Sequence, residues 1–150
     1  MKTLISESSS QTRHIAEEFA RNLEPPAVIC LHGDLGAGKT CFVQGLAKGL
    51  GWEEGVTSPT FGLVQEFRTQ PPLIHADLYR LNHPSEIWSL GLEEWLEEDA
   101  IVAVEWSERV KDFWPDDAWQ VEICALENAE NFREIRMWRE GEDDQTRTGH

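Results

Sequence analysis

A glycine-rich segment, Gly33-Asp34-Leu35-Gly36-Ala37-Gly38-Lys39-Thr40, has the residue types and spacing of a phosphate-binding loop, G-x-x-x-x-G-K-[ST]. In such a loop the backbone N–H groups converge on the phosphates, the lysine adds a positive charge, and the threonine hydroxyl binds Mg²⁺. An incidental glycine turn is the simpler alternative, but the segment lies between an apolar run and an amphipathic stretch, which is the context that the loop requires. The sequence therefore predicts that ATP or ADP is bound by Asp34, Leu35, Gly36, Ala37, Gly38, Lys39, Thr40 and Cys41, with Mg²⁺ on Thr40.

Two carboxylates, Asp77 and Glu105, could act on the metal or on an attacking water. Glu105 ends the apolar run 101–104, and ligands of α/β sheets bind at the carboxyl ends of the strands. Asp77 stands among apolar residues, where a carboxylate is costly to bury unless it is paired. The structural alternatives are a solvated strand end for Glu105, and a pair with Arg80 or a capped turn for Asp77.

Two weaker signals accompany these residues. The segment Thr57-Ser58-Pro59-Thr60 carries hydroxyls that could sense the terminal phosphate, as switch loops do, although such a cluster is more often an ordinary turn. Trp106 directly follows Glu105, so its ring could stack on adenine. Most of the seven tryptophans are expected to pack in the core or at its rim, so position rather than residue type selects Trp106.

The elements that must position these residues follow an α/β pattern. Amphipathic periodicity predicts helices over 8–23 and 40–50, and a third helical stretch from 83 that is broken near Gly91. Continuous apolar runs at 27–31 and 100–104 predict buried strands, 61–67 and 73–78 predict a hairpin, and 119–126 and 132–138 are expected to finish one sheet edge. The sequence thus predicts a three-layer α/β fold like that of P-loop NTPases, with a mixed, mainly parallel central sheet that includes an antiparallel hairpin.

Composition limits the other classes of function. The 150 residues, 40% of them hydrophobic, fit a single domain over 1–140, followed by a polar tail at 141–150 that we expect to be disordered. The net charge of -15 disfavours direct attraction to nucleic-acid phosphates or to an anionic membrane. No C-x-x-C pair occurs, and no stretch approaches the roughly 20 apolar residues of a membrane span, so a cytoplasmic location is expected.

Taken together and in order, four segments resemble the TsaE (YjeE) family over residues 8–138. They are Gly33–Thr40, Ser58-Pro59-Thr60-Phe61, His75-Ala76-Asp77-Leu78-Tyr79-Arg80-Leu81 and Val104-Glu105-Trp106. The D-L-Y-R and V-E-W elements are more discriminating than the glycine loop, which many families share. The family's usual phenylalanine before D-L-Y-R is Ala76 here.

The resemblance implies a bacterial P-loop ATPase required for N6-threonylcarbamoyladenosine in tRNA. It implies hydrolysis of ATP to ADP and phosphate that resets an assembly with the TsaD and TsaB proteins. Together with the acidic net charge, this leads us to expect that tRNA is reached only through that assembly and that no membrane is bound. By family pattern, Mg²⁺ is held by Thr40 and Glu105, with Asp77 beside them, and the hydrolytic site includes Lys39, Thr60, Asp77 and Glu105. Trp106 is expected near the base, and Thr12 and Arg133 are expected to complete the nucleotide pocket.

Two other functions share the glycine loop. A small-molecule kinase needs an acceptor pocket and usually a basic lid, whereas the stretch after Asp77 is rich in Glu, Trp and Leu. A nucleotide-dependent switch without turnover shares every motif with the ATPase, so the sequence does not separate these two.

Overall fold

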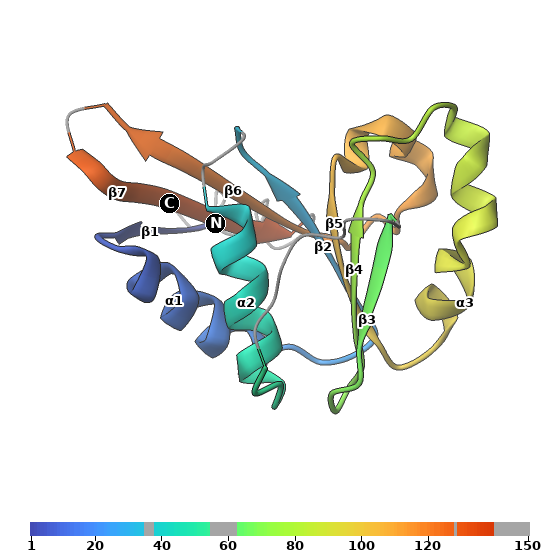
Figure 1. Cartoon of the computed structure of the whole chain (residues 1–150), viewed down its shortest axis with the longest axis horizontal. Coiled ribbons are helices and arrows are strands. Elements are labelled where there is room, and N and C mark those ends of the chain that lie inside the picture. Colours follow the sequence, from blue (N-terminus) through green and yellow to red (C-terminus); the bar gives the residue numbers. More distant parts are fainter. Residues whose placement is uncertain (35–37, 55–62, 128, 140–150) are drawn as a thin grey trace.

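The computed structural model describes residues 1–34, 38–54, 63–127 and 129–139. Its centre is a seven-stranded sheet with the strand order β1-β7-β6-β2-β5-β4-β3 (Figure 1). The strands are β1 (Lys2–Ser6), β2 (Ala27–His32), β3 (Val64–Phe67), β4 (Leu73–Asp77), β5 (Ile101–Glu105), β6 (Trp119–Leu126) and β7 (Ala129–Arg139). The helices are α1 (Ser9–Arg21), α2 (Lys39–Gly49) and α3 (Leu92–Glu97), together with the 3₁₀ segments η1 (Pro84–Leu90) and η2 (Ser107–Phe113). The predicted polar tail, 141–150, lies outside the described residues.

The strand pairings fix the direction of each strand. β2 pairs in parallel with both β5 and β6, and β4 pairs in parallel with β5. β3 is antiparallel to β4, and β7 is antiparallel to both β6 and β1. All strands except β3 and β7 therefore run in the same direction. The predicted mixed, mainly parallel sheet, with its antiparallel hairpin at β3–β4, is confirmed.

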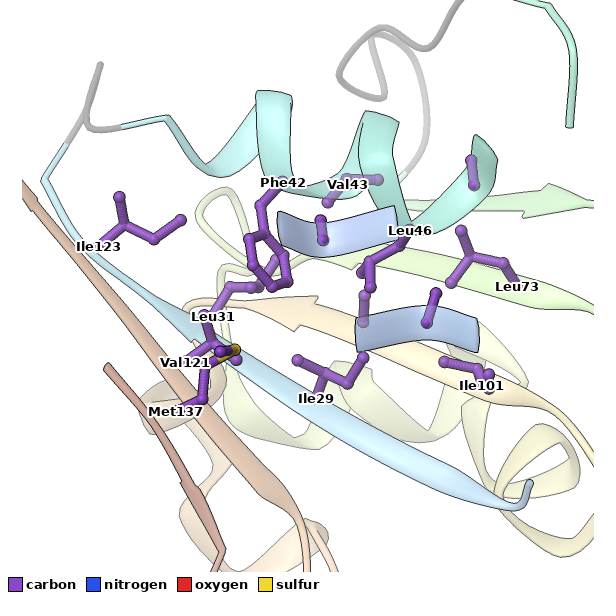
Figure 2. Close-up of a cluster of buried hydrophobic side chains, with 14 of the residues drawn as sticks. Ile29, Leu31, Phe42, Val43, Leu46, Leu73, Ile101, Val121, Ile123 and Met137 are labelled. Carbon is purple, nitrogen blue, oxygen red and sulfur yellow. The ribbon is translucent and has the colours of Figure 1, made fainter. Parts of the chain in front are cut away.

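Helices cover both faces of this sheet because its central strands are apolar on both faces. Side chains alternate along a strand, so Ile29 and Leu31 of β2 face α1 and α2, while Val28 and Cys30 face the opposite layer. Figure 2 shows the first of these cores, in which Phe42 of α2 packs toward β2. The other core is enclosed by α3, η1 and η2 (Figure 1). The predicted three-layer α/β fold is confirmed.

Two glycines allow α1 and α2 to approach closely. A Cβ atom added at Gly45 would lie 2.2 Å from the carbonyl oxygen of Arg13 and 2.6 Å from Cβ of Ala16. A Cβ atom added at Gly49 would lie 2.5 Å from the carbonyl oxygen of Glu17. Real Cβ atoms do not approach other atoms so closely, so any larger residue must push the helices apart. The start of α1 is thereby held beside the start of α2.

Residues 2–6 form an edge strand, β1, that the sequence pattern does not predict. Only Ser6 of this strand is buried, so the run has no apolar periodicity. β1 pairs with β7, and β6 pairs with β2, so the expectation that the strands at 119–126 and 132–138 finish the sheet edge is wrong. The pairing joins the two ends of the sequence, and local spacing carries no information about it.

Candidate nucleotide-binding site

The predicted phosphate-binding loop lies between β2 and α2. β2 ends at His32, and α2 begins at Lys39 directly after Gly38. Gly38 has φ 114° and ψ 15°, a conformation that L side chains rarely adopt, so this turn requires glycine. The first N–H groups of an α-helix give its N-terminus a positive potential that attracts anions. Of the residues predicted to bind nucleotide here, Leu35, Gly36 and Ala37 lie outside the described residues, as does Thr60.

The two predicted carboxylates lie side by side at the carboxyl ends of β4 and β5. In the register of these strands Asp77 is opposite Glu105, and Leu31 of β2 is opposite Glu105 on the other side. Leu73 and Ile101, at the starts of β4 and β5, face the α1–α2 layer. Side chains alternate along a strand, so Asp77 and Glu105 lie on that same face, toward the start of α2.

Glu105 is the centre of a buried polar cluster. Its Oε1 atom lies 3.6 Å from Nζ of Lys39, and both side chains are 7% exposed. Its Oε2 atom lies 2.7 Å from Nε2 of His75, whose side chain is 1% exposed. The Lys39 ammonium also lies 5.1 Å from the centre of the Trp106 ring. The structure thus brings together the predicted phosphate-binding lysine, the predicted metal carboxylate and the tryptophan that follows it.

The environment of Glu105 keeps its carboxyl group ionised. Burial by itself raises the pKa of this group. The hydrogen bond and charge interaction with His75, together with the Lys39 ammonium, outweigh that effect and hold the pKa of Glu105 below its ordinary value of 4.5. The site therefore presents a carboxylate, the form that binds a metal cation, at neutral pH.

Asp77 combines a structural contact with its place beside Glu105. Its Oδ1 atom accepts a hydrogen bond of 3.1 Å from the backbone N–H of Tyr79, and its own N–H donates to the carbonyl of Leu63 at 2.8 Å. The carboxylate therefore caps the turn that follows β4, which was the structural alternative for this residue. Its role toward the metal or the water stays a prediction.

Trp106 has an unusual backbone conformation. Its φ of 63° and ψ of 38° lie in the left-handed region, and it is the one non-glycine residue with positive φ in the described parts of the chain. Such conformations cost free energy in L residues and are concentrated at functional sites. The ring lies 5.1 Å from that of Tyr79, which is itself exposed, so an aromatic surface borders the Lys39–Glu105 pair.

Thr12 and Arg133 are the other two residues predicted for the nucleotide pocket, and both are neighbours of Ser6. The Thr12 and Ser6 hydroxyl oxygens are 2.6 Å apart and buried. Ser6 of β1 is opposite Arg133 of β7 in the sheet. The guanidinium of Arg133 donates to the carbonyls of Glu130 and Phe132. These three residues lie toward the edge of the sheet, near the start of α1.

A contact of Cys41 shows that Thr12 and its neighbours in α1 lie close to the start of α2. Nη1 of Arg13, the residue after Thr12 in α1, lies 3.9 Å from Sγ of Cys41 in the first turn of α2. The Thr12 end of α1 is thereby adjacent to the N-terminus of α2. Among the described residues, Thr12, Lys39 and Cys41 therefore lie around that N-terminus.

A family model described as "Threonylcarbamoyl adenosine biosynthesis protein TsaE" matches residues 6–135. The chain belongs to the TsaE family. It is 44% identical over 142 residues to the tRNA threonylcarbamoyladenosine biosynthesis protein TsaE of Aquifex aeolicus, covering 93% of this chain and 97% of the relative. It is 37% identical over 133 residues to the TsaE protein of Treponema pallidum, covering 89% of this chain and 97% of the relative.

A solved structure shares the fold of this TsaE-family chain. The crystal structure of Bacillus subtilis YdiB superposes with a TM-score of 0.77 at 29% sequence identity, covering 99% of this chain and 96% of YdiB. The family model and the two TsaE relatives confirm the family resemblance stated from the sequence motifs. None of the helices in the described parts of the chain has the length and apolar composition needed to cross a membrane.

The carboxylates of this TsaE-family chain are compatible with Mg²⁺. Among the described residues, no group of three or more His, Cys, Asp and Glu side chains could hold a metal by itself. Mg²⁺ in nucleotide sites does not need such a group, because it keeps several waters and is bound by one or two carboxylates together with phosphate oxygens. The neighbouring Asp77 and Glu105 carry carboxylate oxygens, which are of this ligand type.

Two residues of the site were not identified from the sequence. His75 lies two positions before Asp77, and the alternation of a strand places both on one face, so that spacing was the available signal. Ser6 carried no comparable signal, because it belongs to the unpredicted strand β1.

A separate groove lies away from the site. It has a volume of about 680 Å³ and runs between α1 and the strands β1 and β7, with Phe19, Trp119 and Trp138 among its lining residues. Of the residues predicted to bind nucleotide or metal, none that the structure describes lines it. The Lys39–Glu105 cluster and this groove are therefore separate features of the structure.

Proposed function

We propose that this chain binds ATP with Mg²⁺ at the Lys39–Glu105 site and hydrolyses it to ADP and phosphate in the biosynthesis of N6-threonylcarbamoyladenosine in tRNA. The observation that carries the nucleotide site is the buried ion pair between Lys39 and Glu105, 3.6 Å apart at the N-terminus of α2. Membership of the TsaE family supports the pathway.

The roles of the residues follow from their chemistry. Lys39 and the N–H groups at the start of α2 bind the phosphates, since both direct positive charge to the same place. Thr40 and Glu105 would hold the magnesium ion, with Asp77 beside them, and the ion when bound would offset the charge that develops on the phosphate oxygens. Trp106 contacts the base.

Two residues on the other side of the start of α2 complete the proposed pocket. Thr12 lies in α1, and Arg133 lies in β7 beside Ser6, the hydrogen-bond partner of Thr12. Thr60, from the segment that follows α2 in the sequence, lines the hydrolytic site in this proposal.

In the proposed reaction a water molecule attacks the γ-phosphorus in line with the bond to the bridging oxygen. That bond breaks, ADP leaves with the bridging oxygen, and the water proton passes to the departing phosphate or to solvent. Glu105 is held by both His75 and Lys39, which suits a fixed metal ligand, whereas Asp77 makes its contact with a backbone N–H and is better suited to orient the water.

The proposal also includes the partners that the family resemblance implies. Hydrolysis resets an assembly with the TsaD and TsaB proteins, and tRNA is contacted through that assembly. The net charge of -15 supports this indirect contact, since a strongly acidic chain gains no electrostatic attraction to RNA phosphates.

The test is phosphate release from ATP, measured for the chain alone and with TsaD, TsaB and tRNA. We expect slow release by the chain alone, faster release by the assembly, and loss of that release in Lys39→Ala. The matched control is Lys48→Ala, which removes an exposed lysine of the same helix. No release under any condition would support a switch without turnover, and transfer of the γ-phosphate to a metabolite would support a kinase.

A further inference from the structure

His75 directs its polar contact to Glu105. It lies in β4 opposite Ala103 of β5, and the small alanine leaves room for the imidazole to reach diagonally to Glu105, two residues further along β5. Nε2 of His75 lies 2.7 Å from Oε2 of Glu105. Its other ring nitrogen, Nδ1, is buried and has no hydrogen-bond partner within the described residues.

The two oxygens of Glu105 have different partners. Oε2 is held by His75, while Oε1 faces Nζ of Lys39 at 3.6 Å. The last torsion of a glutamate side chain is broad, so a carboxylate that lacks a fixed partner samples many orientations. A hydrogen bond to Oε2 fixes the plane of the group and thereby the direction of Oε1. Groups that hydrogen-bond a metal-binding carboxylate in this way set its orientation and affect metal affinity.

A purely structural histidine would not be expected in this position. A buried polar atom without a partner destabilises a fold, and Nδ1 of His75 is such an atom in the part of the chain described here. An apolar side chain of similar size would fill the space without that cost. The hydrogen bond between Nε2 and Glu105 therefore accounts for a histidine here, despite the cost of its buried Nδ1.

We propose that His75 is a positioning residue, whose Nε2–H donates to Oε2 of Glu105 and holds Oε1 toward the magnesium ion and the phosphates. The inference rests on the proposed function, because it gives Glu105 its role toward the metal. His75 itself does not contact the nucleotide in this proposal. It acts through Glu105.

Three substitutions separate this role from simple packing. His75→Gln carries an amide N–H donor at about the distance of Nε2 from the backbone and keeps the bond to Glu105. His75→Asn carries the same donor group on a shorter side chain that does not reach. His75→Leu fills the space without a donor.

The measurement is the affinity for ADP by calorimetry, with Mg²⁺ and with EDTA, alongside thermal unfolding of each variant. We expect the gain in affinity that Mg²⁺ provides to fall about 10- to 100-fold in His75→Leu and His75→Asn, the range found when a partner of a metal ligand is removed. His75→Gln is expected to keep most of that gain. Affinity in EDTA is expected to stay nearly the same in all three variants.

The outcomes are distinguishable. If the Mg²⁺ gain survives in His75→Leu, or if all three variants lose it equally, the positioning role is overturned while the proposed function stands. If the unsubstituted chain shows no Mg²⁺ gain with its partner proteins present, the proposed function fails and this inference fails with it. Should His75→Leu not fold, the comparison of His75→Asn with His75→Gln decides.

Discussion

The Lys39–Glu105 ion pair can be tested by a double-mutant cycle in the absence of nucleotide. Lys39→Met and Glu105→Gln each remove one charge with little change of volume, and the double variant removes both. Each single variant leaves one buried charge of the pair without its partner, whereas the double variant contains neither charge. The double variant should therefore be more stable than the sum of the two single losses predicts.

The size of the coupling follows from the geometry. Coulomb's law at the 3.6 Å separation, with an effective dielectric constant of about 20, gives about 4.6 kcal/mol as an upper figure. Relaxation of the single variants lowers this value, and measured couplings between contacting residues run from about 0.5 to 3 kcal/mol. Because both side chains are 7% exposed, we expect about 2–3 kcal/mol, near the top of that range.

The assay is urea unfolding of the four proteins at neutral pH and low salt. The matched control is the pair Lys48–Glu17, 3.9 Å apart, in which the lysine side chain is 70% exposed. Because the lysine of this control pair is solvent-exposed, the pair is expected to couple by about 0.2–1 kcal/mol, although the Glu17 side chain is only 12% exposed. A Lys39–Glu105 coupling no larger than that of the control pair would refute the reasoning, since it would mean that burial does not strengthen this pair.

Three further predictions concern the same elements. The pKa of Glu105 is below 4.5 in the folded chain, so its ionised form stabilises the fold at neutral pH and that stabilisation is lost as the pH falls through the folded pKa. In urea unfolding, the stability difference between the unsubstituted chain and Glu105→Gln should therefore shrink as the pH is lowered from neutral through 4.5 and below, and a constant difference would contradict this. Gly45→Ala should lower the free energy of unfolding by about 1–3 kcal/mol, despite the better helix propensity of alanine, because its Cβ would overlap Arg13; a stabilised variant would contradict the close helix contact. In urea unfolding, the free energy of unfolding of Trp106→Gly should exceed that of Trp106→Ala by about 1 kcal/mol, because glycine adopts a φ of 63° without strain. Equal free energies would argue against the strained backbone.

Much of the fold could be predicted because the residue patterns that specify its strands and helices lie within short segments of the sequence. The runs 27–31 and 100–104 are apolar throughout, and the structure buries both faces of the strands that they form. The break near Gly91 was predicted from residue type, and this glycine has a φ of 76°. Strand β1 could not be predicted, since one buried residue, Ser6, gives no periodicity.

The candidate site, like the fold, could be predicted only where its residues belong to a local sequence pattern. The loop pattern and the strand-end position were enough to propose Lys39 and Glu105 as parts of one site, and the structure places them 3.6 Å apart. The contact of His75 with Glu105 depends on the register between β4 and β5, which the spacing of residues within one strand does not encode. The contact of Ser6 with Thr12 forms where the unpredicted strand β1 meets the start of α1.

The central claim is that the N-terminus of α2 binds a nucleotide polyphosphate with Mg²⁺ through Lys39. The most direct measurement is calorimetric titration of ATP into the folded chain, with its partner proteins present, in Mg²⁺ and in EDTA. We predict saturable binding at one site that is weakened by EDTA and lost in Lys39→Ala, while Lys48→Ala binds normally. Absence of binding to the unsubstituted chain, or equal binding by Lys39→Ala, would contradict the claim.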